Sequence, residues 1–115
     1  MTRTVTERPS FQGDIMVRRI PSLPAGLKPA PAENGVHILA HSETGHHHVI
    51  EERAAQKLID ETNAFVSYLR AVAPGEILHL RDFDTHEPLG IEKGALYEVR
   101  NAREFGVEGW RRTSD

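Results

Sequence analysis

Short apolar or alternating runs, most of them ended by glycine or proline, make up much of this chain. Residues 15–20, 36–41, 77–80 and 95–100 have this form. Because successive side chains of a strand point to opposite faces, such runs predict strands with one face in a core. Residues 21–31 hold four prolines, which lack the backbone N–H that a central strand needs. We therefore expect this segment to be an extended connection on the surface.

Two of the predicted strands are expected to form a hairpin. Residues 33–35 read Glu-Asn-Gly, a turn sequence in which Asn-Gly accepts positive φ angles. Residues 42–45 form the next polar turn. The runs on either side of that second turn, residues 36–41 and 46–51, are therefore predicted to pair.

Residues 52–72 carry two conflicting patterns. Seven residues fall at helical spacing, which favours an amphipathic helix: Ala55, Leu58, Ile59, Thr62, Phe65, Val66 and Leu69. Residues 65–69, however, are rich in aromatic and β-branched types, and residues 61–63 suit the tip of a hairpin. Periodicity alone favours the helix, and both interpretations stay open at this point.

The pattern as a whole predicts a mainly β fold, either a small barrel or a sandwich of short antiparallel strands. The 115 residues suit one domain with one modest core. We expect this single β-rich domain to span residues 12–115. Residues 1–11 are mostly polar and are predicted to form a flexible N-terminal arm.

The composition excludes several classes of site. The chain has no cysteine, which rules out disulfides, thiolate metal sites and cysteine nucleophiles. Its 14 basic and 17 acidic residues give a net charge of -3, which argues against sequence-independent nucleic-acid binding. No apolar run is long enough for a membrane span, and residues 1–10 lack the apolar core of a secretory signal. We expect neither nucleic acid nor a membrane as a partner.

Three of the seven histidines are consecutive, at residues 46–48. In a strand, His46 and His48 would share one face and His47 would point to the other. Neutral imidazoles placed in this way are good ligands for zinc, iron, nickel or copper. Two other interpretations remain: a row of surface or interface histidines, and a histidine-lined pocket for an organic or anionic ligand.

Three motifs resemble those of a family of small uncharacterised proteins from bacterial genomes and bacteriophages. They are a Gln-Gly-Asp start at residues 12–14, a Thr-Gly-His-x-His centre at 44–48, and a Gly-x-x-Tyr-Glu-Val end at 94–99 followed by Arg-Glu-Phe at 103–105. The motifs occur in the same order and cover most of residues 12–115. The resemblance implies a mostly β fold and, for residues 57–72, two strands joined near Asn63.

The resemblance also implies two further histidines, which His79 and His86 match at a wider spacing, as if residues 80–85 were an insertion. The candidate metal ligands are then His46, His48, His79 and His86. A looser similarity connects the histidine pair, Glu51 and His86 with the metal-binding β-barrels called cupins. We expect no resident cofactor unless these groups hold a divalent transition metal.

Catalytic motifs are missing: no serine lies in a Gly-x-Ser-x-Gly elbow and there is no glycine-rich phosphate loop. The first functional prediction is therefore a non-enzymatic structural or assembly protein of phage or prophage type, in concrete form a capsid decoration or cement component of the virion. Its partners would be further copies of the chain, for example in a trimer, and a capsid protein. It would be found in the virion or in the cytoplasm of a bacterial host. The alternative is a cupin-like metalloprotein with an open coordination position, which would make it an enzyme.

Overall fold

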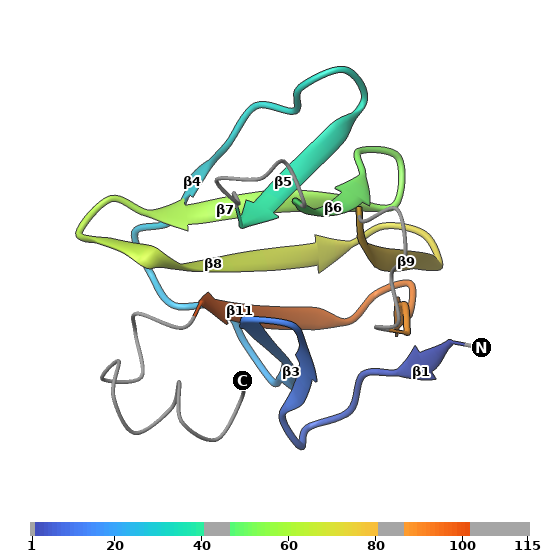
Figure 1. Ribbon diagram of the computed structural model, residues 1–115. Helices are drawn as coiled ribbons and strands as arrows, with labels where there is room; N and C mark the ends of the chain where they lie inside the picture. Colours follow the sequence, from blue (N-terminus) through green and yellow to red (C-terminus); the bar gives the residue numbers. More distant parts are fainter. Residues whose placement is uncertain (1, 41–46, 81–86, 102–115) are drawn as a thin grey trace.

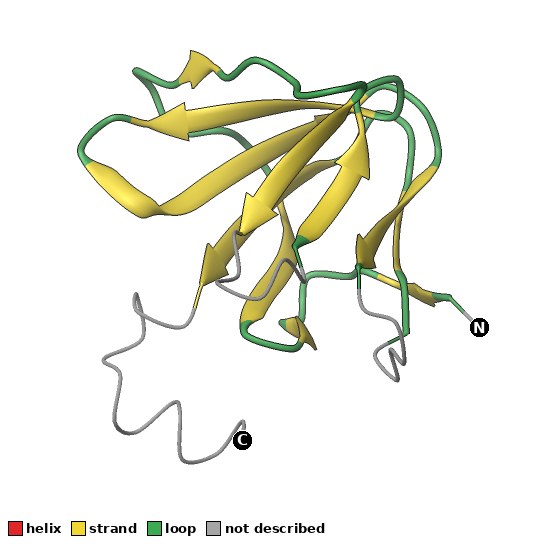
Figure 2. Ribbon diagram, turned by 45° about the horizontal axis from the view of Figure 1, so that its top comes forward, coloured by secondary structure: helices red, strands yellow, loops and turns green. Residues whose placement is uncertain are grey.

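A computed structural model of the chain describes residues 2–40, 47–80 and 87–101. This part of the chain contains strands and no helix, so the prediction of a small, mainly β domain is confirmed (Figure 2). No helix in it is long and apolar enough to span a membrane. The strands are β1 (Arg3–Thr4), β2 (Ser10–Gln12), β3 (Ile15–Ile20), β4 (Lys28–Pro29), β5 (Val36–Ala40), β6 (His48–Glu51), β7 (Ala55–Asp60), β8 (Asn63–Ala71), β9 (Gly75–His79), β10 (Leu89–Ile91) and β11 (Leu96–Asn101).

The strands form two sheets with the main core between them (Figure 1). One sheet has the order β1-β10-β9-β6-β5, and the other has the order β2-β3-β11-β8-β7-β4. Among these pairs, β1–β10 is parallel and the rest are antiparallel. Both sheets contribute fully buried side chains to this core, including Ile15, Leu69 and Tyr97 from the six-stranded sheet and Ile50, Ile77 and Leu89 from the five-stranded one.

Residues 52–72 contain a hairpin, so the helix that periodicity favours is wrong. Strands β7 and β8 pair from Ala55↔Ala71 onwards and turn at residues 61–62. The turn is held by Asp60, whose Oδ1 accepts hydrogen bonds from the backbone N–H and the hydroxyl of Thr62. The helical spacing arises because both faces of the hairpin bury apolar residues: Leu69 lies in the main core, while Leu58 lies in a second cluster on the other face.

The proline-rich segment covers the outer face of the six-stranded sheet. Leu58, Val66 and Tyr68 are buried there beneath Ile20, Leu23 and Leu27. The segment contributes only the two-residue strand β4, which lies at the sheet edge beside β7. Proline can occupy this edge because one side of an edge strand needs no ladder hydrogen bond.

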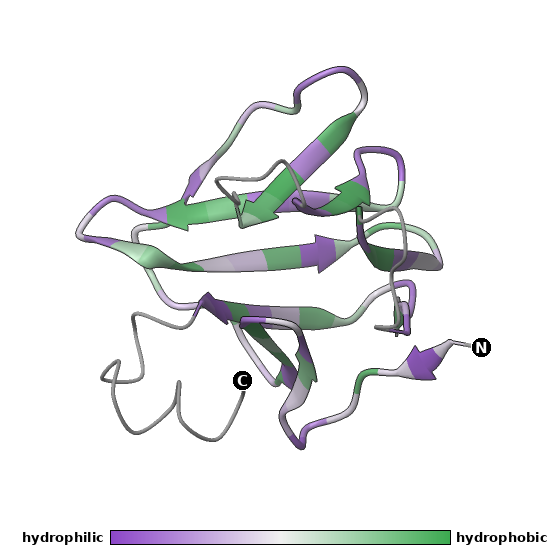
Figure 3. Ribbon diagram, in the orientation of Figure 1, coloured by the Kyte–Doolittle hydropathy of each residue, from purple (hydrophilic) through white to green (hydrophobic). Residues whose placement is uncertain are grey.

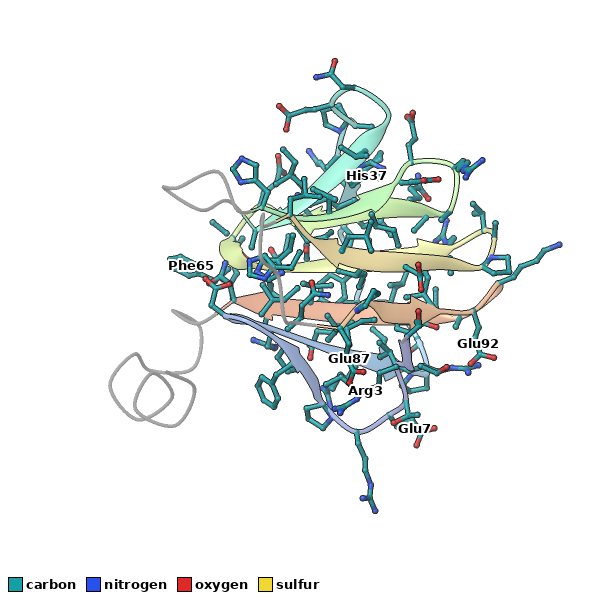
Figure 4. The ribbon with its side chains drawn as sticks, turned by 45° about the vertical axis from the view of Figure 1, so that its right-hand side comes forward. Arg3, Glu7, His37, Phe65, Glu87 and Glu92 are labelled. Atoms are coloured by element: carbon teal, nitrogen blue, oxygen red, sulfur yellow. The ribbon has the colours of Figure 1, made fainter. Side chains whose placement is uncertain are left out.

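Part of the N-terminal segment packs on the domain, in contrast to the flexible arm predicted for residues 1–11. Strand β1 pairs with β10, and Val5 is 1% exposed within the main core. The Arg3 guanidinium lies 2.9 Å from the Glu87 carboxylate, and the two side chains are neighbours in Figure 4. Burial of Val5, together with backbone hydrogen bonds from Arg3 N–H to Pro88 and from Val5 N–H to Gly90, explains the difference.

Candidate functional site

The buried side chain of His48, which is 2% exposed at the start of β6, contacts polar side chains through both of its ring nitrogens. Its Nδ1 lies 2.9 Å from Oε1 of Gln12, and its Nε2 lies 2.9 Å from Oδ1 of Asp14. Gln12 ends β2, and Asp14 lies in the turn before β3. The turn between two strands of one sheet therefore holds a histidine of the other sheet from both sides.

The orientation of the Gln12 amide determines what His48 must do. Gln12 Nε2 donates to the backbone oxygens of Ile77, at 2.9 Å, and Glu87, at 3.1 Å. Both donors of this amide are thereby used, so its Oε1 acts as the acceptor toward His48. In this arrangement His48 Nδ1 carries a proton and donates it to Gln12.

Asp14 imposes a similar condition on the second ring nitrogen. The hydrogen bond from His48 lowers the pKa of Asp14 below its ordinary value of 3.8, against the opposing effect of partial burial. The Asp14 carboxylate is then ionised near neutral pH and acts only as an acceptor. Both contacts are satisfied together when both nitrogens of His48 carry protons. When the ring is protonated at both nitrogens, the contact is a charge-assisted pair between the buried His48 and Asp14, whose side chain is 61% exposed.

His79 completes this group, which we call the histidine cluster (Gln12, Gly13, Asp14, His48 and His79). His79 is the register partner of His48 across β6 and β9, and the two rings stack with their centroids 4.1 Å apart and their planes 9° apart. Gly13 lies directly against both rings: a Cβ added there would be 3.3 Å from Cε1 of either histidine. Its φ of +57° also favours glycine, so the position is constrained twice.

The histidine cluster brings the Gln-Gly-Asp motif into contact with His48, the last residue of the Thr-Gly-His-x-His motif. The contact lies where the two sheets meet. The chain belongs to the DUF8820 family. This family is described as a domain of unknown function, and its model matches residues 11–102. No curated protein and no solved structure matches the chain. The match to DUF8820 includes all five residues of the histidine cluster.

The structure brings together two of the four predicted metal ligands in this DUF8820 domain. His48 and His79 are in contact, whereas His46 and His86 lie outside the described residues. No group of three or more potential ligands comes together among the residues that the structure describes. Both nitrogens of His48 already contact Gln12 and Asp14, so a metal would have to displace one of these contacts. The four-histidine metal site stays a prediction.

Glu51, the additional ligand that the similarity to cupins implies, faces away from the histidine cluster. It lies three positions after His48 on β6, so its side chain is on the opposite face of the strand. It is exposed and forms an ion pair with Arg53 instead. In contrast, the sequence reasoning did not name Gln12 and Asp14 as site residues. The sequence could have indicated both residues, because both belong to the Gln-Gly-Asp motif.

Proposed function

We propose that the protein is a non-enzymatic assembly protein that acts through contacts between copies of the chain and with other proteins. The observation that carries this proposal is an apolar row on the outer face of the five-stranded sheet. Ile38, Val49 and Leu78 are direct register partners across β5, β6 and β9. Leu78 is 38% exposed, and Leu80, two positions further on, is 47% exposed. Val49 itself is only 6% exposed, so the exposed apolar surface of this row consists mainly of Leu78 and Leu80. Adjacent exposed apolar side chains of this kind are typical of a protein-binding surface.

The edges of the sheets favour contact through this face over contact by strand addition. At the edge strand β5, the Ile38 carbonyl accepts a hydrogen bond from Lys57 Nζ at 2.7 Å. The backbone N–H and C=O of Val36 are both bonded to Glu33. The other described edge strands, β1, β2 and β4, are only two or three residues long. Short or capped edges of this kind oppose pairing with another chain.

Contact through the outer face of the five-stranded sheet does not require a free strand edge. Figure 3 shows that β5, at the edge of that sheet, is apolar apart from one hydrophilic position, which is His37. Packing two copies of this face together would remove Leu78 and Leu80 from water, and burial of apolar area is the main favourable term in association. A second copy of the chain is therefore the partner that we propose for this surface.

The concrete form of the proposal is a decoration or cement component of a phage or prophage virion. Its support is the resemblance of the three motifs to proteins of bacterial genomes and bacteriophages, together with the small β domain and the exposed apolar row.

Native mass spectrometry of untagged protein, purified without chelator or nickel resin, tests the proposal. We expect a trimer or another defined oligomer that carries no metal. Replacing Leu78 and Leu80 together by serine should convert it to monomer, whereas Val72→Ser, at a position that is 51% exposed outside this row, should leave it assembled. Addition to undecorated phage capsids, followed by sedimentation, tests the virion role. A wild-type monomer that does not bind capsids would overturn the proposal.

The cupin-like metalloprotein is the alternative, and the contact between His48 and His79 is the observation that favours it. The same spectra distinguish the two. One metal ion per chain, lost in both His48→Ala and His46→Ala, would replace the assembly proposal with this one.

A further inference from the structure

A cavity opens at the same end of the sandwich as the histidine cluster. Gln12 is the register partner of Ile15 in β3, and Ile15 is the partner of Asn101 in β11. Asn101 lines a cavity of about 430 Å³, a volume typical of small-molecule sites. The cavity is lined by Leu39, Lys57, Ile59, Asp60, Glu61, Asn63, Ala64, Phe65, Val66, Ser67 and Asn101.

The strand registers arrange these lining residues from the interior outward. Lys57 pairs with Leu69 in the fully buried part of the sheet. One step along the strands, Ser67 pairs with both Ile59 and Val99. Asn101 follows Val99 by two residues on the same face, nearest the strand end. The cavity therefore has a cation on its interior side, apolar walls in the middle and an amide near its opening.

The opening lies at the tip of the β7–β8 hairpin. Figure 4 shows Phe65, one of the apolar lining residues, at the end of the molecule opposite Glu92. Leu39 reaches the same cavity from β5, so both sheets contribute to its walls. An elongated apolar molecule entering beside Phe65 would pass between the sheets toward Lys57.

Two polar groups in this cavity match complementary groups of a ligand. Burial lowers the pKa of Lys57, because its ammonium group loses contact with water. Among the described residues, this group donates a hydrogen bond to the Ile38 carbonyl. Asn101 Oδ1 is buried, and no group among the described residues donates a hydrogen bond to it. The two acidic lining residues have partners of their own: Asp60 accepts from Thr62, and Glu61 pairs with Lys28 at 3.1 Å.

We propose that this cavity binds a small amphipathic carboxylate that carries a hydroxyl group at its far end. The carboxylate pairs with Lys57 on the interior side, the hydrocarbon body lies along Leu39, Ile59 and Phe65, and the hydroxyl donates to Asn101. This binding site is separate from the apolar row proposed for assembly, since Leu78 and Leu80 are not among its lining residues.

Titration of the full chain with 8-hydroxyoctanoate, followed by amide NMR shifts, tests this inference. We expect saturable shifts at residues 57–67 and 99–101, with weaker binding of octanoate and at least tenfold weaker binding of octylammonium. Lys57→Met should weaken 8-hydroxyoctanoate binding tenfold or more. Lys93→Met, which removes an exposed lysine that neither lines the cavity nor pairs with a residue lining it, should leave it unchanged.

Asn101→Leu provides an independent variant if Lys57→Met fails to fold. It should abolish the preference for 8-hydroxyoctanoate over octanoate and leave the binding of octanoate intact. The inference is overturned if no saturable binding occurs, if octylammonium binds as tightly as octanoate, or if Asn101→Leu retains the preference for the hydroxyl.

Discussion

The outer faces of the two sheets differ in how their apolar residues are covered. On the six-stranded sheet, Leu58 and Tyr68 are each 6% exposed beneath the proline-rich segment. On the five-stranded sheet, Leu78 and Leu80 are 38% and 47% exposed, and the described residues form no second buried cluster over them. The same chain thus covers one outer face internally, whereas the partner that we propose would cover the exposed leucines of the other. Apolar residues on the outer face of a sheet therefore indicate a binding surface only when it is known which segments of the same chain cover that face.

The largest expected effect comes from truncating leucine on each face in turn. Leu58→Ala should lower the free energy of unfolding by about 2–4 kcal/mol, because it leaves a cavity under a fixed cover. Leu78→Ala should lower it by less than about 1 kcal/mol, because much of that side chain is already in water. Urea unfolding at one low protein concentration measures both. Equal losses would show that the two faces are covered alike.

The histidine cluster connects the two sheets, and its removal should affect them together. Gln12→Ala leaves His48 Nδ1 and the carbonyls of Ile77 and Glu87 without this partner, which should cost about 1–3 kcal/mol of unfolding free energy. Gln56→Ala, at a surface hydrogen bond to Arg70, is the matched control and should cost less than about 0.5 kcal/mol. Thermal unfolding of the two variants side by side decides the comparison.

Weakening the cover should make the two outer faces more alike. Leu27→Ser removes one of the partly buried side chains that pack over Leu58 and should cost about 1 kcal/mol. It should also increase binding of a dye such as ANS, which reports exposed apolar surface. If Leu27→Ser matches the wild type in both measurements, then the proline-rich segment does not act as a cover.

The smallest effect concerns the protonation of Asp14. Because the folded-state pKa of Asp14 is lowered, its contribution to stability is present above about pH 3.8 and is lost as the pH falls through the folded-state value. Asp14→Asn should flatten this acid limb of the stability curve. The contribution should stay below about 1 kcal/mol, because the carboxylate is largely exposed to solvent. A Glu7→Gln variant should retain the wild-type acid limb.

The strands were predictable where a short apolar run lay between turn residues. Residues 15–20 and 95–100 were assigned from composition and bounding turns, and the structure has strands there. The hairpin at 55–71 was obscured because its two faces enter different clusters, so its apolar spacing imitates a helix. The packing of Val5 was equally hidden, since one buried valine in a polar segment leaves no periodic signal.

The candidate site was only half predictable, for a different reason. His48 and His79 attract attention as histidines in strands, whereas Gln12 gains its role from a contact 36 residues away along the chain. The cavity residues Lys57 and Asn101 belong to no motif at all. Their significance arises only when strand register places them on one inner face.

The hydrogen bond from Lys57 to the Ile38 carbonyl caps the edge of β5 only while the two sheets are packed together. Its donor comes from the six-stranded sheet and its acceptor from the edge of the five-stranded sheet. Any fluctuation that separates the sheets there releases the edge of β5 at the same moment as it exposes the core. Aggregation of this protein should therefore begin from a locally opened native state, before global unfolding, and its rate should track the opening of that one seam.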